Sequence, residues 1–109
     1  MGVTKHDIYS DTQNEFALMA KAFAHPARVA ILEYLLSSDQ CINSDLVKEL
    51  GLAQATISQH LKALKETGII KGSIEGASIC YCIDADRWKE FKDQFEKLFN
   101  QFDHNKNKC

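Results

Sequence analysis

Cys80 and Cys82 are the residues whose type and spacing most directly suggest chemistry. They lie two positions apart in residues 78–83, a short run that is typical of a β-strand. Because side chains two apart on a strand point to the same face, we expect the two thiols to lie together. The intervening side chains should then face the core: Ile79, Tyr81 and Ile83. Soft thiolates favour soft or borderline metals and trivalent metalloids, so the pair is suited to binding such an ion.

Other interpretations of the cysteines stay open. A cysteine is often an inert small hydrophobe. A disulfide between Cys80 and Cys82 is disfavoured, because residues two apart on an extended strand lie near the upper limit of disulfide geometry. Cys41 with Cys80 or Cys82 is instead a candidate redox pair, which a cytosolic regulator can use as a switch. Cys109 lies at the end of the chain in a polar tail, and we include it in no site.

Length and composition limit the kind of protein that can position these thiols. The chain has 109 residues, of which 45% are hydrophobic and 26% charged, as expected for one globular domain spanning residues 1–109. We expect residues 1–11 to form a loose arm and residues 104–109 a frayed tail. The formal net charge is -2, so any DNA-binding surface must be a local patch.

The same features exclude several classes of protein. No apolar run approaches ~20 residues and the N-terminus has no apolar signal segment, so we expect a cytoplasmic protein without a membrane span. Four cysteines in such a chain are more consistent with thiols, ligands or sensors than with a disulfide framework. A small thiol enzyme is disfavoured, because catalysis needs a base and an enclosed pocket, and no histidine lies near Cys80 and Cys82 in the sequence.

The rest of the sequence predicts a mainly α-helical domain with a small β-hairpin. His25 and Pro26 separate the first two helices, because proline disfavours helical geometry in the residue before it and fits the first turn of the next helix. The second helix should bury Val29, Ile31, Leu32, Leu35 and Leu36. The expected elements are helices 12–24 and 26–36, a brief strand 40–42, a helix from Asn43 or Ser44 to Leu50, a helix 54–67, strands 69–74 and 78–83, and a last helix capped by Asp84.

Two short helices joined at Gly51 and Leu52 and followed by a hairpin are typical of a winged helix-turn-helix, in the order α-α-(β)-α-α-β-β-α. The outward face of helix 54–67 carries uncharged hydrogen-bonding side chains, lysines and one acid, Glu66; its candidate contacts are Gln54, Thr56, Ser58, Gln59, His60, Lys62 and Lys65. Glutamine and histidine can reach base edges, while threonine, serine and lysine can reach phosphates. Lys71 on the hairpin is a further phosphate candidate. A solvated polar helix face explains the same pattern equally well.

Two sequence motifs resemble those of a known protein family. Residues 21–32 (KAFAHPARVAIL) and 50–64 (LGLAQATISQHLKAL) resemble the opening motif and the recognition helix of the ArsR/SmtB family of bacterial repressors. The hairpin that ends in Tyr81, Cys82 and Ile83 is similar to the wing of that family. The resemblance implies a dimeric winged-helix repressor that leaves its operator when an inducer, often a thiophilic metal or metalloid, binds. One departure is Ala53, where the family usually has a serine that caps the recognition helix, so this cap should be weaker by about 1 kcal/mol.

The last helix carries an aromatic stripe that predicts a dimer surface. Its members are Trp88, Phe91, Phe95, Phe99 and Phe102, and the first helix offers Phe16, Met19 and Phe23 beside them. The alternative is that the last helix simply closes its own domain. A homodimer with two-fold symmetry would place two recognition helices about one DNA turn apart, so double-stranded DNA with an imperfect palindrome is the expected operator.

Cys41 is expected to complete the thiol site. In a winged helix the short strand before the helix-turn-helix usually pairs with the second wing strand, which would bring Cys41 within about 4.5–5.5 Å (Cα to Cα) of a residue opposite it. Cys41, Cys80 and Cys82 are therefore the predicted metal ligands within one subunit. The resemblance also implies a difference from the family. Family members with a thiolate site beside the helix-turn-helix carry Cys-x-Cys there, whereas this chain has Asn43 in place of the second cysteine. Another site of that family pairs Asp and His on the last helix of each subunit. We do not predict that site here, because the only histidine near this helix is His104, which lies past the aromatic stripe.

The sequence therefore predicts a DNA-binding transcriptional repressor that leaves a palindromic operator on binding trivalent arsenic, antimony or zinc. We expect no organic cofactor and no enzyme activity. The alternative is a repressor of the same fold whose thiols sense oxidants or sulfur species.

Overall fold

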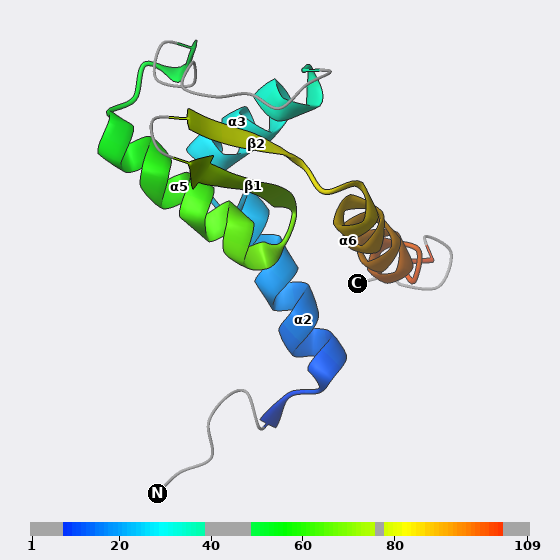
Figure 1. The fold of residues 1–109 in the computed structure, drawn as a ribbon. Helices are drawn as coiled ribbons and strands as arrows, with labels where there is room; N and C mark the ends of the chain where they lie inside the picture. Colours follow the sequence, from blue (N-terminus) through cyan, green and yellow to red (C-terminus); the bar gives the residue numbers. More distant parts are fainter. Residues whose placement is uncertain (1–7, 39–48, 76–77, 104–109) are drawn as a thin grey trace, which may run out of the picture.

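The structure is a computed structural model that describes residues 8–38, 49–75 and 78–103. These residues form a mainly helical domain with a two-stranded antiparallel hairpin (Figure 1), as the sequence predicts. The elements in chain order are α2 (Asp11–Ala20), the 3₁₀ turn η1 (Lys21–Phe23), α3 (Pro26–Leu36), α5 (Gln54–Thr67), β1 (Ile70–Glu75), β2 (Ser78–Ile83) and α6 (Ala85–Phe99).

The first helix differs from its prediction at both ends. Ser10 and Gln13 form a capping box, in which the Ser10 hydroxyl accepts from the Gln13 amide at 3.1 Å and the Gln13 side chain accepts from the Ser10 amide at 2.9 Å. α2 therefore begins at Asp11, inside the expected arm. It ends at Ala20 and tightens into η1, because the chain must become extended at His25 before Pro26.

The helices α3 and α5 have the predicted bounds. Pro26 opens α3, and the His25 ring caps it by accepting a hydrogen bond from the Ala27 amide at 3.0 Å. α5 has no side-chain cap at Ala53, as expected from the missing serine. It ends at Gly68, whose left-handed φ of 85° suits glycine and stops the helix.

The hairpin pairs Lys71 with Cys82 and Ile70 with Ile83 across its two strands. β1 begins at Ile70, one residue later than predicted. Gly72 has a φ of 147°, and a Cβ there would lie 1.9 Å from the Cys80 carbonyl oxygen. The close approach of the two strands thus requires glycine at this position.

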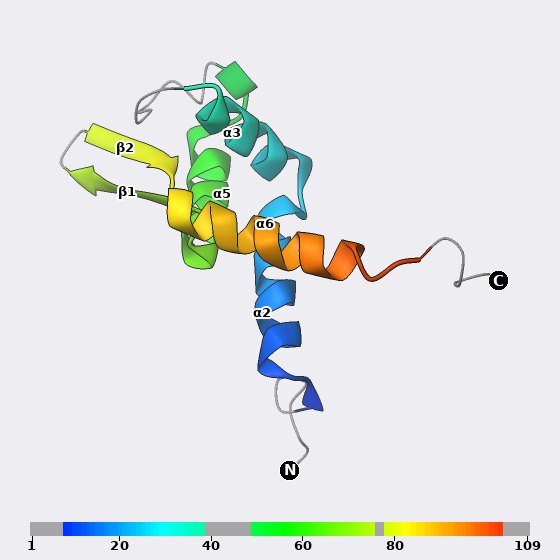
Figure 2. The same cartoon turned by 90° about the vertical axis from the view of Figure 1, so that its right-hand side faces the viewer.

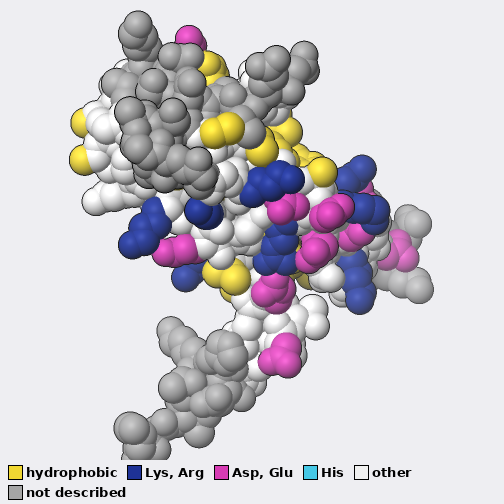
Figure 3. All heavy atoms as spheres, in the orientation of Figure 1, with side chains coloured by type: hydrophobic (Ala, Val, Ile, Leu, Met, Phe, Trp, Pro, Cys, Tyr) yellow, Lys and Arg dark blue, Asp and Glu magenta, His cyan; other side chains and the backbone are white. Residues whose placement is uncertain are grey.

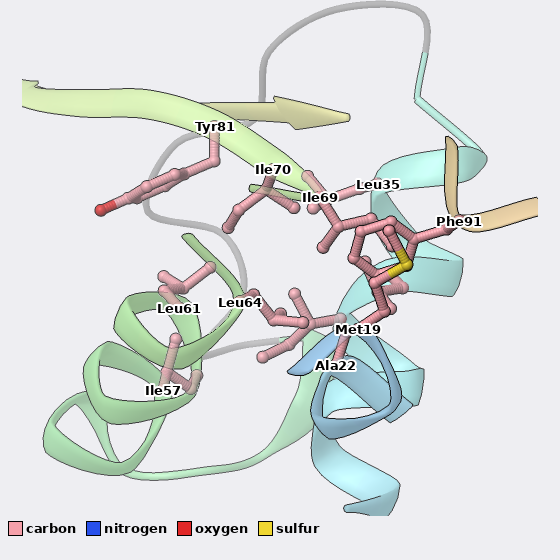
Figure 4. Close-up of a cluster of buried hydrophobic side chains, with 12 residues drawn as sticks. Met19, Ala22, Leu35, Ile57, Leu61, Leu64, Ile69, Ile70, Tyr81 and Phe91 are labelled. Atoms are coloured by element: carbon pink, nitrogen blue, oxygen red, sulfur yellow. The ribbon is translucent and has the colours of Figure 1, made fainter. Parts of the chain in front are cut away.

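The described residues share one hydrophobic core, drawn in Figure 4. Its members are Met19, Ala22, Ile31, Leu32, Leu35, Ile57, Leu61, Leu64, Ile69, Ile70, Tyr81 and Phe91. Val29 and Leu36 were expected in the buried face of α3, but they are 38% and 52% exposed, so this part of the prediction is wrong. One stripe of a helix faces a core, and Ile31, Leu32 and Leu35 already fill that stripe.

The strand β2 leads from the side of α5 into α6, while α2 crosses α6 and extends away from the core (Figures 1 and 2). Asp84 caps α6 as predicted, accepting from the Arg87 amide at 3.0 Å. α6 ends at Phe99, so Phe102 lies beyond the helix rather than on its stripe. No helix within the described residues is both long and apolar enough to cross a membrane.

Several predictions fall outside the described residues. They concern the arm before residue 8, the strand 40–42 with Cys41, the caps Asn43 and Ser44, and the tail 104–109. Of the helix that was expected to end at Leu50, the structure describes only Glu49 and Leu50, and both are helical.

Candidate nucleic-acid interface

α5 presents a polar face on the side opposite its buried residues. Ile57, Leu61 and Leu64 pack into the core and fix how the helix is turned. Of the predicted DNA-contacting side chains, the exposed ones are Gln54, Ser58, Gln59, Lys62, Lys65 and, on β1, Lys71. Figure 3 shows basic side chains over α5, and a band of mixed charge over α6. The chain therefore combines a net charge of -2 with a local cluster of lysines on and beside α5.

Thr56 and His60 differ from the other predicted contacts, because both are half-buried. The His60 ring turns toward the start of α3, where its Nδ1 accepts a hydrogen bond from Arg28 Nε at 3.3 Å. The His25 ring lies beside it, with 4.6 Å between the ring centroids. Packing between α3 and α5 therefore holds His60 at the margin of the polar face, and its predicted contact with DNA stays a prediction.

The environment of His60 favours the neutral form of its ring. Burial lowers the pKa of His60 below its ordinary value of 6.5, and electrostatic interactions with His25 and Arg28 lower it further. A neutral ring whose Nδ1 accepts a hydrogen bond carries its proton on Nε2. The Nε2–H of His60 is therefore a donor that the contact with Arg28 does not use. Sequence reasoning assigned no role to Arg28, although it belongs to the motif at residues 21–32. No periodicity signals that this side chain meets α5.

The hairpin carries two of the three predicted thiol ligands. Cys80 is exposed and Cys82 is half-buried, and their spacing on β2 places both on one face, while Tyr81 between them is buried as predicted. Cys41 lies outside the described residues. Within those residues no three His, Cys, Asp or Glu side chains come together in a way that would hold a metal ion. A site with three ligands from this chain would therefore need Cys41 or another residue outside the described ones.

The aromatic side chains of α2, η1 and α6 form one surface, which we call the aromatic surface. Its rings are in contact, with centroid distances of 4.7 Å for Phe16–Phe95, 5.7 Å for Phe23–Phe95 and 6.2 Å for Phe95–Phe99. A mainly apolar groove on it is lined by Phe23, Trp88, Phe91, Phe95 and Phe99, together with the charged residues Lys92 and Glu96. Phe99 is 67% exposed and Phe102 49%.

Two members of the predicted dimer surface belong to the core instead. Met19 is 2% exposed and Phe91 is 3% exposed in a single chain, so they leave almost no area for a partner. Both sit where α2 and α6 meet the rest of the domain (Figure 4). The aromatic stripe thus divides between residues that close their own domain and residues that remain exposed, and for the exposed residues the dimer surface stays a prediction.

Comparisons with known proteins agree with this fold. Residues 25–71 match the family model described as "Bacterial regulatory protein, arsR family". An uncharacterized HTH-type transcriptional regulator from Methanocaldococcus jannaschii is 41% identical over 70 residues, which cover 64% of this chain and 79% of that protein. The HTH-type transcriptional repressor SmtB of Mycobacterium tuberculosis is 38% identical over 63 residues, or 58% of this chain and 46% of SmtB.

A solved structure gives the same result. The ArsR-like transcriptional regulator from Rhodococcus sp. RHA1 superposes with a TM-score of 0.68 at 26% sequence identity, covering 83% of this chain and 82% of that one. The chain spans about half the length of several curated relatives that it matches, such as SmtB at 46%. The matched region holds α3 and α5, which carry the described polar face and its support. The chain belongs to the ArsR family of helix-turn-helix transcriptional regulators.

Proposed function

We propose that this chain is a homodimeric repressor that binds a palindromic DNA operator and is released by a thiophilic inducer. The observation that carries the proposal is the polar face of α5, which is anchored by three buried apolar residues and leaves Gln54, Ser58, Gln59, Lys62 and Lys65 exposed. A helix held in this way fits the major groove, where Gln54, Ser58 and Gln59 meet base edges or phosphates and the lysines meet phosphates.

Dimerisation is supported by the exposed part of the aromatic surface. Monomeric proteins rarely leave contiguous apolar patches of this kind in water. A second copy of this chain is the occupant that we propose, because the two-fold contact would present two α5 helices to one duplex. The operator would then be an imperfect palindrome.

Inducer binding is supported by Cys80 and Cys82 on the wing. Their thiolates would hold a soft ion such as trivalent arsenic, antimony or zinc, together with Cys41, and the ion would supply a link between these cysteines. The hairpin follows α5 directly, so a change in the wing acts on the DNA-reading surface. A tenfold loss of operator affinity requires only about 1.4 kcal/mol of coupling.

DNA binding is tested by selecting duplexes from a random-sequence pool with the wild-type chain and measuring their affinity by fluorescence anisotropy. Gln59→Ala should cost about 1–3 kcal/mol on the selected duplex and relax its sequence preference, because it removes a base contact. Lys62→Ala should weaken binding to all sequences and reduce the salt slope by about one. Lys89→Ala on α6 is the matched control. If Gln59→Ala retains both affinity and preference, α5 does not read bases through this residue.

The inducer is tested on the same complex with arsenite, zinc or peroxide, followed by mass spectrometry of the protein. A bound ion adds its mass and releases DNA, whereas peroxide alone releasing DNA with added oxygen or a disulfide would favour the redox alternative. Because thiols lose protons on binding, ion affinity should fall as the pH drops. If Cys80→Ser and Cys82→Ser leave release by every probe intact, the wing thiols are not the sensor.

A further inference from the structure

Arg87, in the first turn of α6, joins three helices through one guanidinium group. Its Nη2 lies 2.5 Å from Glu15 Oε1 on α2, and its Nη1 lies 2.9 Å from Glu90 Oε2 on α6. Its Nε donates to the Thr67 carbonyl oxygen at 2.9 Å, and Thr67 is the last residue of α5. The guanidinium also lies over the Phe91 ring, 5.1 Å from its centroid. The planar fork of arginine suits this task, because it presents several donors in a fixed geometry.

The end of α5 is the place where such a contact has the greatest effect. Thr67 is 4% exposed, and its hydroxyl donates to the Leu64 carbonyl at 2.7 Å and accepts from the Ile69 amide. The next residue, Gly68, packs directly against Arg87, since a Cβ there would lie 3.1 Å from Arg87 Nε. The side chain of Arg87 is only 20% exposed. α5 therefore ends against a rigid group that belongs to α6 and is held from the other side by α2.

The neighbouring backbone adds a second link between the same elements. The Asp84 amide donates to the Ile69 carbonyl at 3.0 Å, and the Asp84 carboxylate caps α6 through the Arg87 amide. Along the chain α5 and α6 are connected through the hairpin (Figures 1 and 2). The Arg87 contacts thus bridge the helix that faces DNA and the helices that carry the aromatic surface.

We infer that Arg87 is a positioning residue that sets the direction of α5 relative to α2 and α6. In a dimer built on the aromatic surface, this direction fixes the distance between the two reading helices, and hence the half-site spacing that the protein accepts. This inference rests on the proposed function. Arg87 makes no base contact in this scheme and acts through the Thr67 carbonyl and Glu15.

The experiment uses the full chain and the duplex that wild type selects from a random-sequence pool. The half-sites of that duplex are then moved apart or together by single base pairs, and affinity is measured for each spacing. Arg87→Met keeps an apolar side chain packed on Gly68 but removes the N–H donors of the guanidinium. Arg87→Lys keeps the positive charge but lacks the planar guanidinium. Glu15→Gln loosens only the α2 side. Lys89→Met is the matched control, because Lys89 is a basic residue of α6 that pairs with Asp93 within the same helix.

Arg87→Met and Arg87→Lys should lower affinity at the preferred spacing about tenfold and flatten the preference among spacings. Glu15→Gln should do the same to a smaller extent, and Lys89→Met should leave the profile unchanged. A purely structural role predicts a reduced active fraction with the spacing preference intact, and that result would overturn the inference. If Arg87→Met does not fold, the Arg87→Lys and Glu15→Gln profiles decide. If wild type selects no duplex, the proposed function fails, and the inference falls with it.

Discussion

Phe99 offers the sharpest test of the dimer, because most of its side chain is exposed in a single chain. It is 67% exposed, and its ring contact is with Phe95 at 6.2 Å between centroids. A phenylalanine side chain presents roughly 200 Å² of area, so about 130 Å² remains in water here. At about 25 cal/mol per Å², covering half of that area stabilises the dimer by about 1.5 kcal/mol per chain.

Phe99→Ala should therefore weaken the dimer by about 3 kcal/mol, because the loss occurs in both copies. This corresponds to a dissociation constant raised by roughly 100-fold. Analytical ultracentrifugation over a range of protein concentrations measures the constant, and circular dichroism checks that the variant stays folded. We expect the variant to stay folded, because Phe99 is largely exposed and its removal costs little core packing.

Leu36→Ala is the matched control for this measurement. Leu36 is a large apolar side chain on α3, 52% exposed, and it does not line the apolar groove. It should leave the dissociation constant unchanged. A wild-type chain that sediments as a monomer, or a Phe99→Ala dimer as tight as wild type, would refute the reasoning and place any interface elsewhere.

Three further predictions test the fold and the site. Gly72→Ala should cost more than about 2 kcal/mol in urea unfolding because of its clash with the opposite strand, whereas Gly51→Ala, with open space around it, should cost only about 1–2 kcal/mol from its left-handed φ. Equal costs would contradict the clash. Ala53→Ser should raise the free energy of unfolding by about 1 kcal/mol, because it supplies the missing cap of α5, and unchanged stability would mean that no cap forms. The pKa of His60 is lowered in the folded state, so the unfolded chain takes up the proton first as the pH falls. The free energy of unfolding should therefore be unaffected well above pH 6.5, and it should decline as the pH falls through 6.5 toward the lower pKa of the folded state. His60→Gln should remove this component of the pH profile, and an identical profile would show that other groups cause it.

The local sequence determined most of the helix and strand boundaries. Gly68 ends α5, Pro26 opens α3 and Asp84 caps α6, because each of these residue types has a strong conformational preference that acts within a few residues. The alternation on β2 likewise predicted which side of the hairpin Tyr81 occupies. The same local signals, together with the two motifs at residues 21–32 and 50–64, were sufficient to identify the family.

The tertiary structure alone decided which side chains remain available for function. Periodicity placed His60 with the DNA-facing residues and Phe91 with the dimer surface, but Arg28 holds the first and the core takes in the second. Periodicity also gave no sign of Arg87, whose partners Glu15 and Thr67 lie far from it along the chain. A pattern along one helix reports which face is apolar or polar. Which neighbour covers that face depends on how segments distant in sequence pack together, and only the folded chain contains that information.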